Sequence, residues 1–82
     1  MMKVWTVIIT HHYDNDESWA EVFVGLTKEK ALEEAYKSLH EHVEDYFGED
    51  VDATTLADLI HWANDEPSEA WYTHDIKAHE LS

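Results

Sequence analysis

KVWTVIITH, residues 3 to 11, is the stretch on which the fold depends. Its β-branched residues favour extended backbone, and successive side chains of a strand point to opposite faces of a sheet. The two alternating sets are Trp5, Val7 and Ile9, and Val4, Thr6, Ile8 and Thr10. This pattern predicts a β-strand, and we expect it to lie in the middle of the sheet.

Two further segments show the same alternation. Residues 19 to 26 follow a polar turn segment, HYDNDES at 12 to 18, and are predicted to complete an antiparallel hairpin with the first strand. Residues 70 to 78 form a third predicted strand. Pro67 separates it from the preceding residues, because proline cannot continue a helix.

Two helices are predicted between the second and third strands. Thr27 is a suitable N-cap for a long amphipathic helix that ends at Gly48. Thr55 and Asp58 have the spacing of a capping box, and they begin a shorter helix that ends near Asn64. The element order is therefore ββααβ. It predicts an α+β fold with a three-stranded, mainly antiparallel sheet and both helices packed on one face.

Length and composition limit the functions that this fold can carry. The 82 residues have room for one domain, residues 1–82, with a thin core. Two glycines cannot build a phosphate-binding loop, and the lack of cysteine excludes disulfides, thiolate nucleophiles and zinc–cysteine sites. The serines lie in no nucleophile-elbow context, so we expect a protein that is not an enzyme and needs no cofactor.

The charge balance points to a particular class of partner. The chain has 19 acidic residues against five lysines and no arginine, for a net charge of −14. Such a chain repels nucleic acids and anionic membranes and attracts basic proteins. The apolar runs are too short to cross a membrane, and the first ten residues do not resemble a signal peptide, so we expect a cytoplasmic protein.

No basic side chain occurs between Lys37 and Lys77 apart from histidines, and this segment is rich in carboxylates. Carboxylates on a rigid scaffold can imitate a nucleic-acid backbone and occupy the basic groove of a nuclease or another nucleic-acid-binding protein. In size and composition, though in no motif, the chain is similar to the small acidic inhibitors that phages and mobile elements use against restriction enzymes or CRISPR effectors. The predicted partner-binding residues are Glu41, Glu44, Asp45, Glu49, Asp50, Asp52, Asp58 and Asp65.

A second interpretation assigns function to the sheet face opposite the helices. The alternation predicts that Trp19, Phe23 and Trp71 share this face, where they would bind a partner or a second copy of the chain. The acidity would then serve only solubility. A one-residue change of strand register would exchange the two faces, and a loop, the C-terminal tail or a displaced helix could instead cover the aromatic side chains.

Seven histidines raise the question of a metal site. No metalloprotease or EF-hand signature occurs, so we predict no functional metal. We expect these histidines to lie in solvent or beside carboxylates that raise their pKa. The loose ligand sets that remain open are Asp58, His61 and Asp65, and His11 or His12 with Asp14, Asp16 and His74 or His79.

Overall fold

The computed structural model of the chain describes residues 2–14, 16–66, 68 and 70–81. The order of elements is ββααβ, as predicted, and the fold is α+β. The elements are β1 (Met2–Tyr13), β2 (Ser18–Gly25), α1 (Lys28–Phe47), α2 (Leu56–Asp65) and β3 (Ala70–Leu81).

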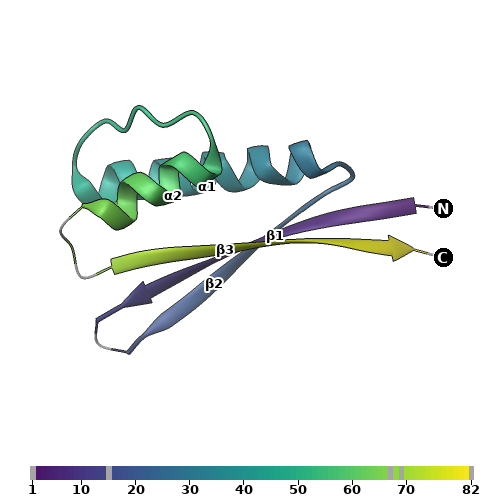
Figure 1. Ribbon diagram of the computed structural model, residues 1–82, viewed down its shortest axis with the longest axis horizontal. Helices are drawn as coiled ribbons and strands as arrows, with labels where there is room; N and C mark the ends of the chain where they lie inside the picture. The colour runs from purple at the N-terminus through teal and green to yellow at the C-terminus, as the bar shows by residue number, and fades with distance from the viewer. Residues whose placement is uncertain (1, 15, 67, 69, 82) are drawn as a thin grey trace.

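The three strands form one antiparallel sheet in the order β2-β1-β3. The predicted central position of the first strand is therefore confirmed. Strand β1 pairs along its whole length with β3, from Met2 opposite Leu81 to Tyr13 opposite Ala70. Both ends of the described chain consequently lie at one end of the sheet, and the β1–β2 hairpin lies at the other (Figure 1).

Both helices pack on the same face of the sheet, as predicted (Figure 1). Helix α1 contacts β1 and β2, and α2 contacts β3 and α1. The core forms where small alanines of α1 meet the apolar residues of β1, and Gly25 lies so close to α1 that an added Cβ would be 2.6 Å from the Ala31 backbone nitrogen. Fully buried core residues include Val7, Ile9, Ala31, Ala35, Leu39, Val43, Leu59, Ala63 and Tyr72.

The helix ends follow the capping chemistry expected from the sequence. The Thr27 hydroxyl accepts a hydrogen bond from the backbone nitrogen of Lys30 at 3.1 Å, and that of Thr55 accepts one from Asp58 at 3.1 Å. Gly48 ends α1 with a φ of 71°, a left-handed conformation that favours glycine. Within the described residues, neither helix combines the length and the apolarity that a membrane-spanning segment requires.

The predicted face assignment of β2 is wrong. Phe23 lies opposite Val7 and Trp19 lies opposite His11, so both aromatic side chains are on the face that the helices cover. Trp71 lies opposite His12, on the other face. The three aromatic residues therefore do not form one surface. The sequence of β2 is ambiguous because both alternating sets are largely apolar, and only the pairing with β1 decides between them.

Asn64 joins α2 to the outer edge of β3. Its side-chain amide donates to the Tyr72 carbonyl oxygen at 2.8 Å, and its side-chain oxygen accepts from the Tyr72 nitrogen at 2.7 Å. Because β3 is an edge strand, these two backbone groups have no strand partner on that side. The amide thus satisfies both groups and holds the C-terminal turn of α2 in place.

We expect Asn64→Asp to lower the free energy of unfolding by about 1–2 kcal/mol, because a carboxylate cannot donate to the Tyr72 carbonyl oxygen. Urea denaturation of both proteins measures the change. The neighbouring substitution Asp65→Asn, at an exposed position, is the control and should leave stability within about 0.5 kcal/mol. Equal stability of Asn64→Asp and the parent chain would contradict the proposed role of this amide.

Candidate functional site

The strand pairing separates the basic residues from most of the acidic ones. Lys3 lies opposite Glu80 and Lys77 lies opposite Thr6, near the end of the sheet where both termini lie. Lys28 and Lys30 open α1, which follows directly on the end of β2 at that same end of the molecule (Figure 1). Lys37 lies near the middle of α1. The basic residues thus occupy one end and the middle of the molecule.

The opposite end, called here the acidic end, is formed by the second half of α1, the α1–α2 loop, the end of α2 and the β1–β2 hairpin. All five lysines belong to the described residues, and none of them lies in these segments. Of the predicted partner-binding residues, Glu41, Asp45, Glu49, Asp50, Asp52 and Asp65 lie there and are exposed. Asp58 is also exposed but lies in the first turn of α2, away from the others.

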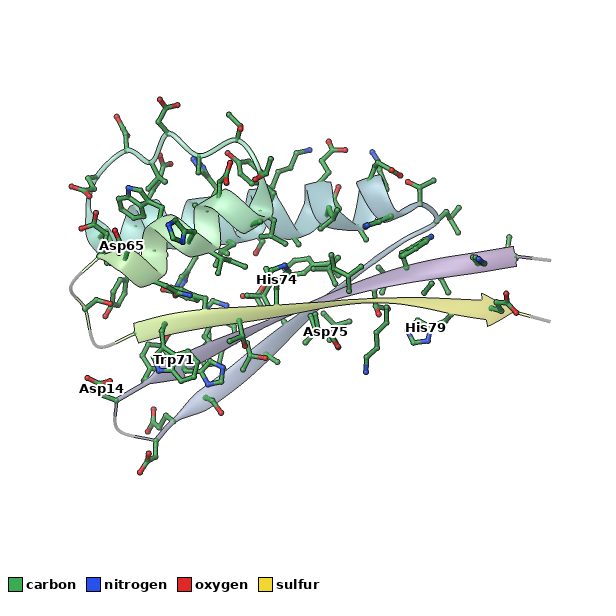
Figure 2. The ribbon with its side chains drawn as sticks, in the orientation of Figure 1. Asp14, Asp65, Trp71, His74, Asp75 and His79 are labelled. Carbon is green, nitrogen blue, oxygen red and sulfur yellow. The ribbon has the colours of Figure 1, made fainter. Side chains whose placement is uncertain are left out.

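The sequence analysis missed the contribution of the hairpin. Asp14, Asp16 and Glu17 connect β1 to β2 and are exposed. Because Tyr13 pairs with Ala70, this turn lies at the same end of the sheet as the last residues of α2. Figure 2 shows Asp14 and Asp65 at this end, with His79 at the other. Asp14 and Asp65 are 51 residues apart in sequence, so no local pattern indicates that they lie at the same end. Antiparallel pairing of the first and third strands was the one signal that could have predicted it.

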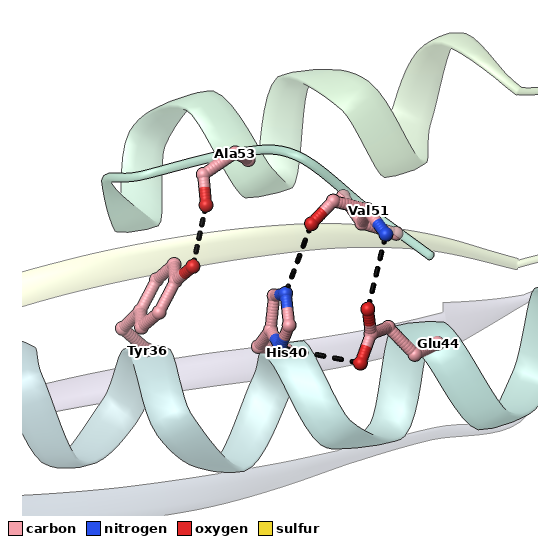
Figure 3. A network of polar contacts seen from close by, with 5 residues as sticks. All are labelled: Tyr36, His40, Glu44, Val51 and Ala53. Carbon is pink, nitrogen blue, oxygen red and sulfur yellow. Dashed lines mark hydrogen bonds and ion pairs between the residues drawn. The ribbon is translucent and has the colours of Figure 1, made fainter. Parts of the chain in front are cut away.

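A network of polar contacts holds the α1–α2 loop against α1 (Figure 3). The Tyr36 hydroxyl donates to the Ala53 carbonyl oxygen. His40 Nε2 lies 3.0 Å from the Val51 carbonyl oxygen, which can only accept, so this nitrogen carries a proton. The Val51 nitrogen in turn donates to Glu44 Oε2 at 3.0 Å. Side chains of α1 therefore hold the backbone of the loop at Val51 and at Ala53, on either side of the exposed Asp52.

Glu44 makes contacts within the chain that were not predicted for it. Its Oε2 accepts from the buried Val51, and its Oε1 lies 3.5 Å from His40 Nδ1. About a third of its side chain remains exposed, so it still adds negative charge to the surface. Its Oε2, however, binds the loop at Val51, so Glu44 also positions the loop that carries other carboxylates.

An open concavity lies beside this network. It is lined by the second half of α1 and by Glu21 of β2. Glu21 Oε2 accepts from the Ser38 hydroxyl at 3.1 Å, and Glu41, His42 and Asp45 complete much of the lining. Such a surface can attract an ammonium or a guanidinium group. No protein-family model, curated protein or solved structure matches the chain.

Behind Glu21 lies a buried aromatic cluster centred on His11. The His11 ring is 1% exposed and stacks on Trp19 with a centroid distance of 3.8 Å. The rings of His42 and Tyr72 lie edge-on to it, at centroid distances of 4.8 and 5.1 Å. Among the described residues, no hydrogen-bond partner is present for His11 Nδ1, His42 Nε2 or the Tyr72 hydroxyl, all of which are buried.

Burial sets the charge of this cluster. Desolvation by burial, together with the nearby His42 and His12, lowers the pKa of His11 to about 4. Glu21 Oε1, 3.6 Å from His11 Nε2, favours the charged form, but this carboxylate is partly exposed and offsets only part of the cost of burial. Burial likewise raises the pKa of Tyr72 to about 12. His11 is therefore neutral at pH 7, contrary to the expectation of a raised pKa.

The loose metal-ligand sets are not brought together. His11 and His12 are adjacent in β1 and point to opposite faces of the sheet, His12 stacking on Trp71 at 3.8 Å. The His79 ring contacts the Thr6 hydroxyl on the outer side of the sheet, while Asp14 lies in the hairpin at the far end. In the part of the chain that the structure describes, no group of three or more potential ligands is arranged to hold a metal ion.

Glu44→Ala should lower the free energy of unfolding by about 1–2 kcal/mol, because it leaves the buried Val51 nitrogen without its acceptor. Glu41→Ala removes the same side chain from an exposed position of the same helix and should change stability by less than about 0.5 kcal/mol. Urea denaturation of the pair tests the distinction. Equal effects of the two substitutions would show that Glu44 does not support the loop.

The neutral state of His11 predicts a pH dependence of stability. Between about pH 6.5 and about pH 4 the unfolded chain binds a proton at His11 that the folded chain does not bind. The free energy of unfolding should therefore fall as the pH is lowered through this range, by at most about 1.4 kcal/mol per pH unit from this residue.

Replacing His11 with phenylalanine removes the titrating group and keeps a ring against Trp19. We expect the stability of His11→Phe to fall less steeply between about pH 6.5 and about pH 5 than that of the parent chain. Urea denaturation at several pH values measures both slopes. Other titrating groups are common to the two proteins, so identical slopes would contradict the buried, neutral state of His11.

Proposed function

We propose that this chain is a non-enzymatic acidic binding protein that occupies the basic nucleic-acid site of another protein by electrostatic and steric mimicry. The observation that carries the proposal is the segregation of charge: carboxylates of α1, the α1–α2 loop, α2 and the hairpin gather at one end, and the lysines lie elsewhere. Scattered carboxylates would serve solubility equally well, whereas a one-sided array creates a field that a basic partner can recognise.

Rigidity of the array supports the same proposal. The exposed residues Glu49, Asp50 and Asp52 flank Val51, whose two backbone groups are both bound to side chains of α1. A preorganised loop loses less conformational entropy on binding than a flexible one. The concavity at Glu21 and Asp45 adds a place where a basic side chain of the partner can enter. The fitting target is a groove lined by lysine and arginine, as in nucleases and other nucleic-acid-binding proteins.

The proposal includes a cellular setting. An inhibitor of the anti-restriction or anti-CRISPR type, made by a phage or a mobile element, acts in the cytoplasm on host enzymes that handle nucleic acid. A chain of net charge −14 repels nucleic acid, so it does not compete with those enzymes for their substrate. It competes with the nucleic acid for the enzyme.

The test uses proteins that DNA-cellulose retains from a bacterial lysate as the probe. The immobilised chain should capture members of this fraction at low salt, and added duplex DNA should release them. High salt should abolish capture, because it screens the attraction between the charged surfaces. Failure to capture any protein of this fraction, or capture that neither DNA nor salt reverses, would overturn the proposal.

Two variants that each lose three carboxylates locate the binding surface on the chain. Asp45→Asn, Glu49→Gln and Asp50→Asn together neutralise the acidic end, and should weaken binding of a captured protein about tenfold, at roughly 0.5 kcal/mol per charge.

The matched control combines Glu29→Gln, Glu34→Gln and Glu80→Gln, which remove the same charge from the part of the molecule that carries the lysines. Titration of one captured protein with each variant measures the difference. Equal weakening by both sets would mean that net charge, and not the acidic end, determines binding.

A further inference from the structure

The sheet face turned away from the helices, called here the outer face, differs from the rest of the surface. Strand register assigns alternate side chains of all three strands to it, since directly opposed residues share a face. Within the described residues no helix or loop covers this face (Figure 1). Its side chains are Met2, Val4, Thr6, Ile8, Thr10, His12, Ser18, Ala20, Val22, Val24, Trp71, Thr73, Asp75, Lys77 and His79.

Large apolar side chains are concentrated there. Met2, Val22, Val24 and Trp71 are 58%, 58%, 59% and 46% exposed. They come from all three strands and extend over the partly exposed Val4 and Ile8 of the central strand. Exposed apolar side chains gathered on one face of a sheet indicate an interaction site.

The outer face is also nearly uncharged. Its only acidic side chain among the described residues is Asp75, and its only lysine is Lys77. The Lys77 ammonium lies 3.7 Å from the Asp75 carboxylate, so the two charges offset one another. In a chain of net charge −14, this is a surface on which negative potential is locally low.

Two pairs of polar side chains on the outer face contact each other. His12 stacks on Trp71 and its Nε2 lies 3.1 Å from the Thr73 hydroxyl. The Thr6 hydroxyl lies 3.1 Å from His79 Nε2. Covering paired polar groups costs less free energy than covering unpaired ones, because their hydrogen bonds are kept. These contacts also hold the Trp71 ring in one orientation.

We propose that the outer face binds a second copy of this chain, forming a symmetric dimer in which the two sheets pack face to face. The charge distribution selects this occupant. Two chains of net charge −14 repel one another, and this repulsion is smallest when they meet at the outer face, where the charges of Asp75 and Lys77 offset one another. A basic partner would instead be drawn to the acidic end. An isologous contact uses the same face of both copies, as a two-fold axis requires.

The area of the outer face is sufficient for this contact. Strands of 12, 8 and 12 residues cover about 500 Å² of flat sheet, at about 3.3 Å per residue and about 4.8 Å between strands. Side chains roughen this surface and increase its area. Two copies whose outer faces overlap completely therefore bury about 1,000 Å² together, which is the lower limit for a specific interface. The thin molecule, with extents of 45 × 29 × 16 Å, would become a four-layered assembly of helices, two sheets and helices.

Sedimentation equilibrium of the complete chain at about 1 to about 500 μM tests the proposal. We expect a species of twice the 9.6 kDa chain mass to form within this range. Val22→Lys and Trp71→Lys place a charge on the two edge strands of the outer face. Each should raise the dimer dissociation constant at least about thirtyfold, since every substitution occurs twice in a symmetric contact.

Leu26→Lys is the matched control, because Leu26 is 66% exposed, lies just outside β2 and acquires the same charge. It should leave the dimer unchanged or strengthen it slightly by reducing repulsion. Lysine is chosen because it makes the chain less negative, so a loss of the dimer cannot come from increased net charge. Circular dichroism confirms that each variant is folded.

A monomer throughout the concentration range would overturn the proposal, as would a dimer that Leu26→Lys disrupts while Val22→Lys and Trp71→Lys do not.

The effect of salt distinguishes this contact from the proposed function. Added salt should strengthen the dimer or leave it unchanged, because it screens the repulsion between two acidic chains. A dimer that dissociates as salt is added would contradict the assignment to the uncharged face. Binding of a basic partner weakens with salt, so each proposal can fail without the other.

Discussion

The packing of α1 against the middle of the sheet is the interaction on which the rest of the structure depends. Val7 and Ile9 of β1 are buried against a row of small and branched residues on α1, among them Ala31 and Ala35. Removing this apolar surface from water is the dominant favourable term for so small a chain. With only two helices, the chain can cover one face of its sheet, and the other face stays in water.

The same packing determines where the charges lie. Helix α1 starts beside the termini and runs toward the hairpin, so its lysine-bearing first half and its acidic second half point to opposite ends of the molecule (Figure 1). The antiparallel pairing of β1 with β3 brings the hairpin to the end of α2. One body thus presents an anionic end and an uncharged apolar face. In our proposals, the first surface binds a basic partner and the second binds another copy of the chain.

Local contacts hold the loop backbone of the acidic end against α1. The backbone of Val51 is bound on both sides by His40 and Glu44, and Tyr36 binds the loop one turn earlier along the helix (Figure 3). On the opposite flank, Glu21 connects Ser38 to the buried His11. Aromatic rings enclose that histidine and keep it neutral. The charged surface therefore rests on an uncharged, closely packed layer.

Local properties of the sequence determined the elements of this protein. The alternation in β1, the threonine caps at Thr27 and Thr55, and Gly48 act over a few residues, so the order ββααβ could be predicted without knowledge of tertiary contacts. The excess of carboxylates after Lys37 is likewise a property of the sequence.

Three features were decided only by the tertiary structure: the face that carries Trp19 and Phe23, the approach of the hairpin to α2, and the burial of His11. Each depends on which residue lies opposite which across two strands, and both faces of β2 are apolar enough to permit either choice. The register was settled by packing between segments distant in sequence, which no local pattern encodes.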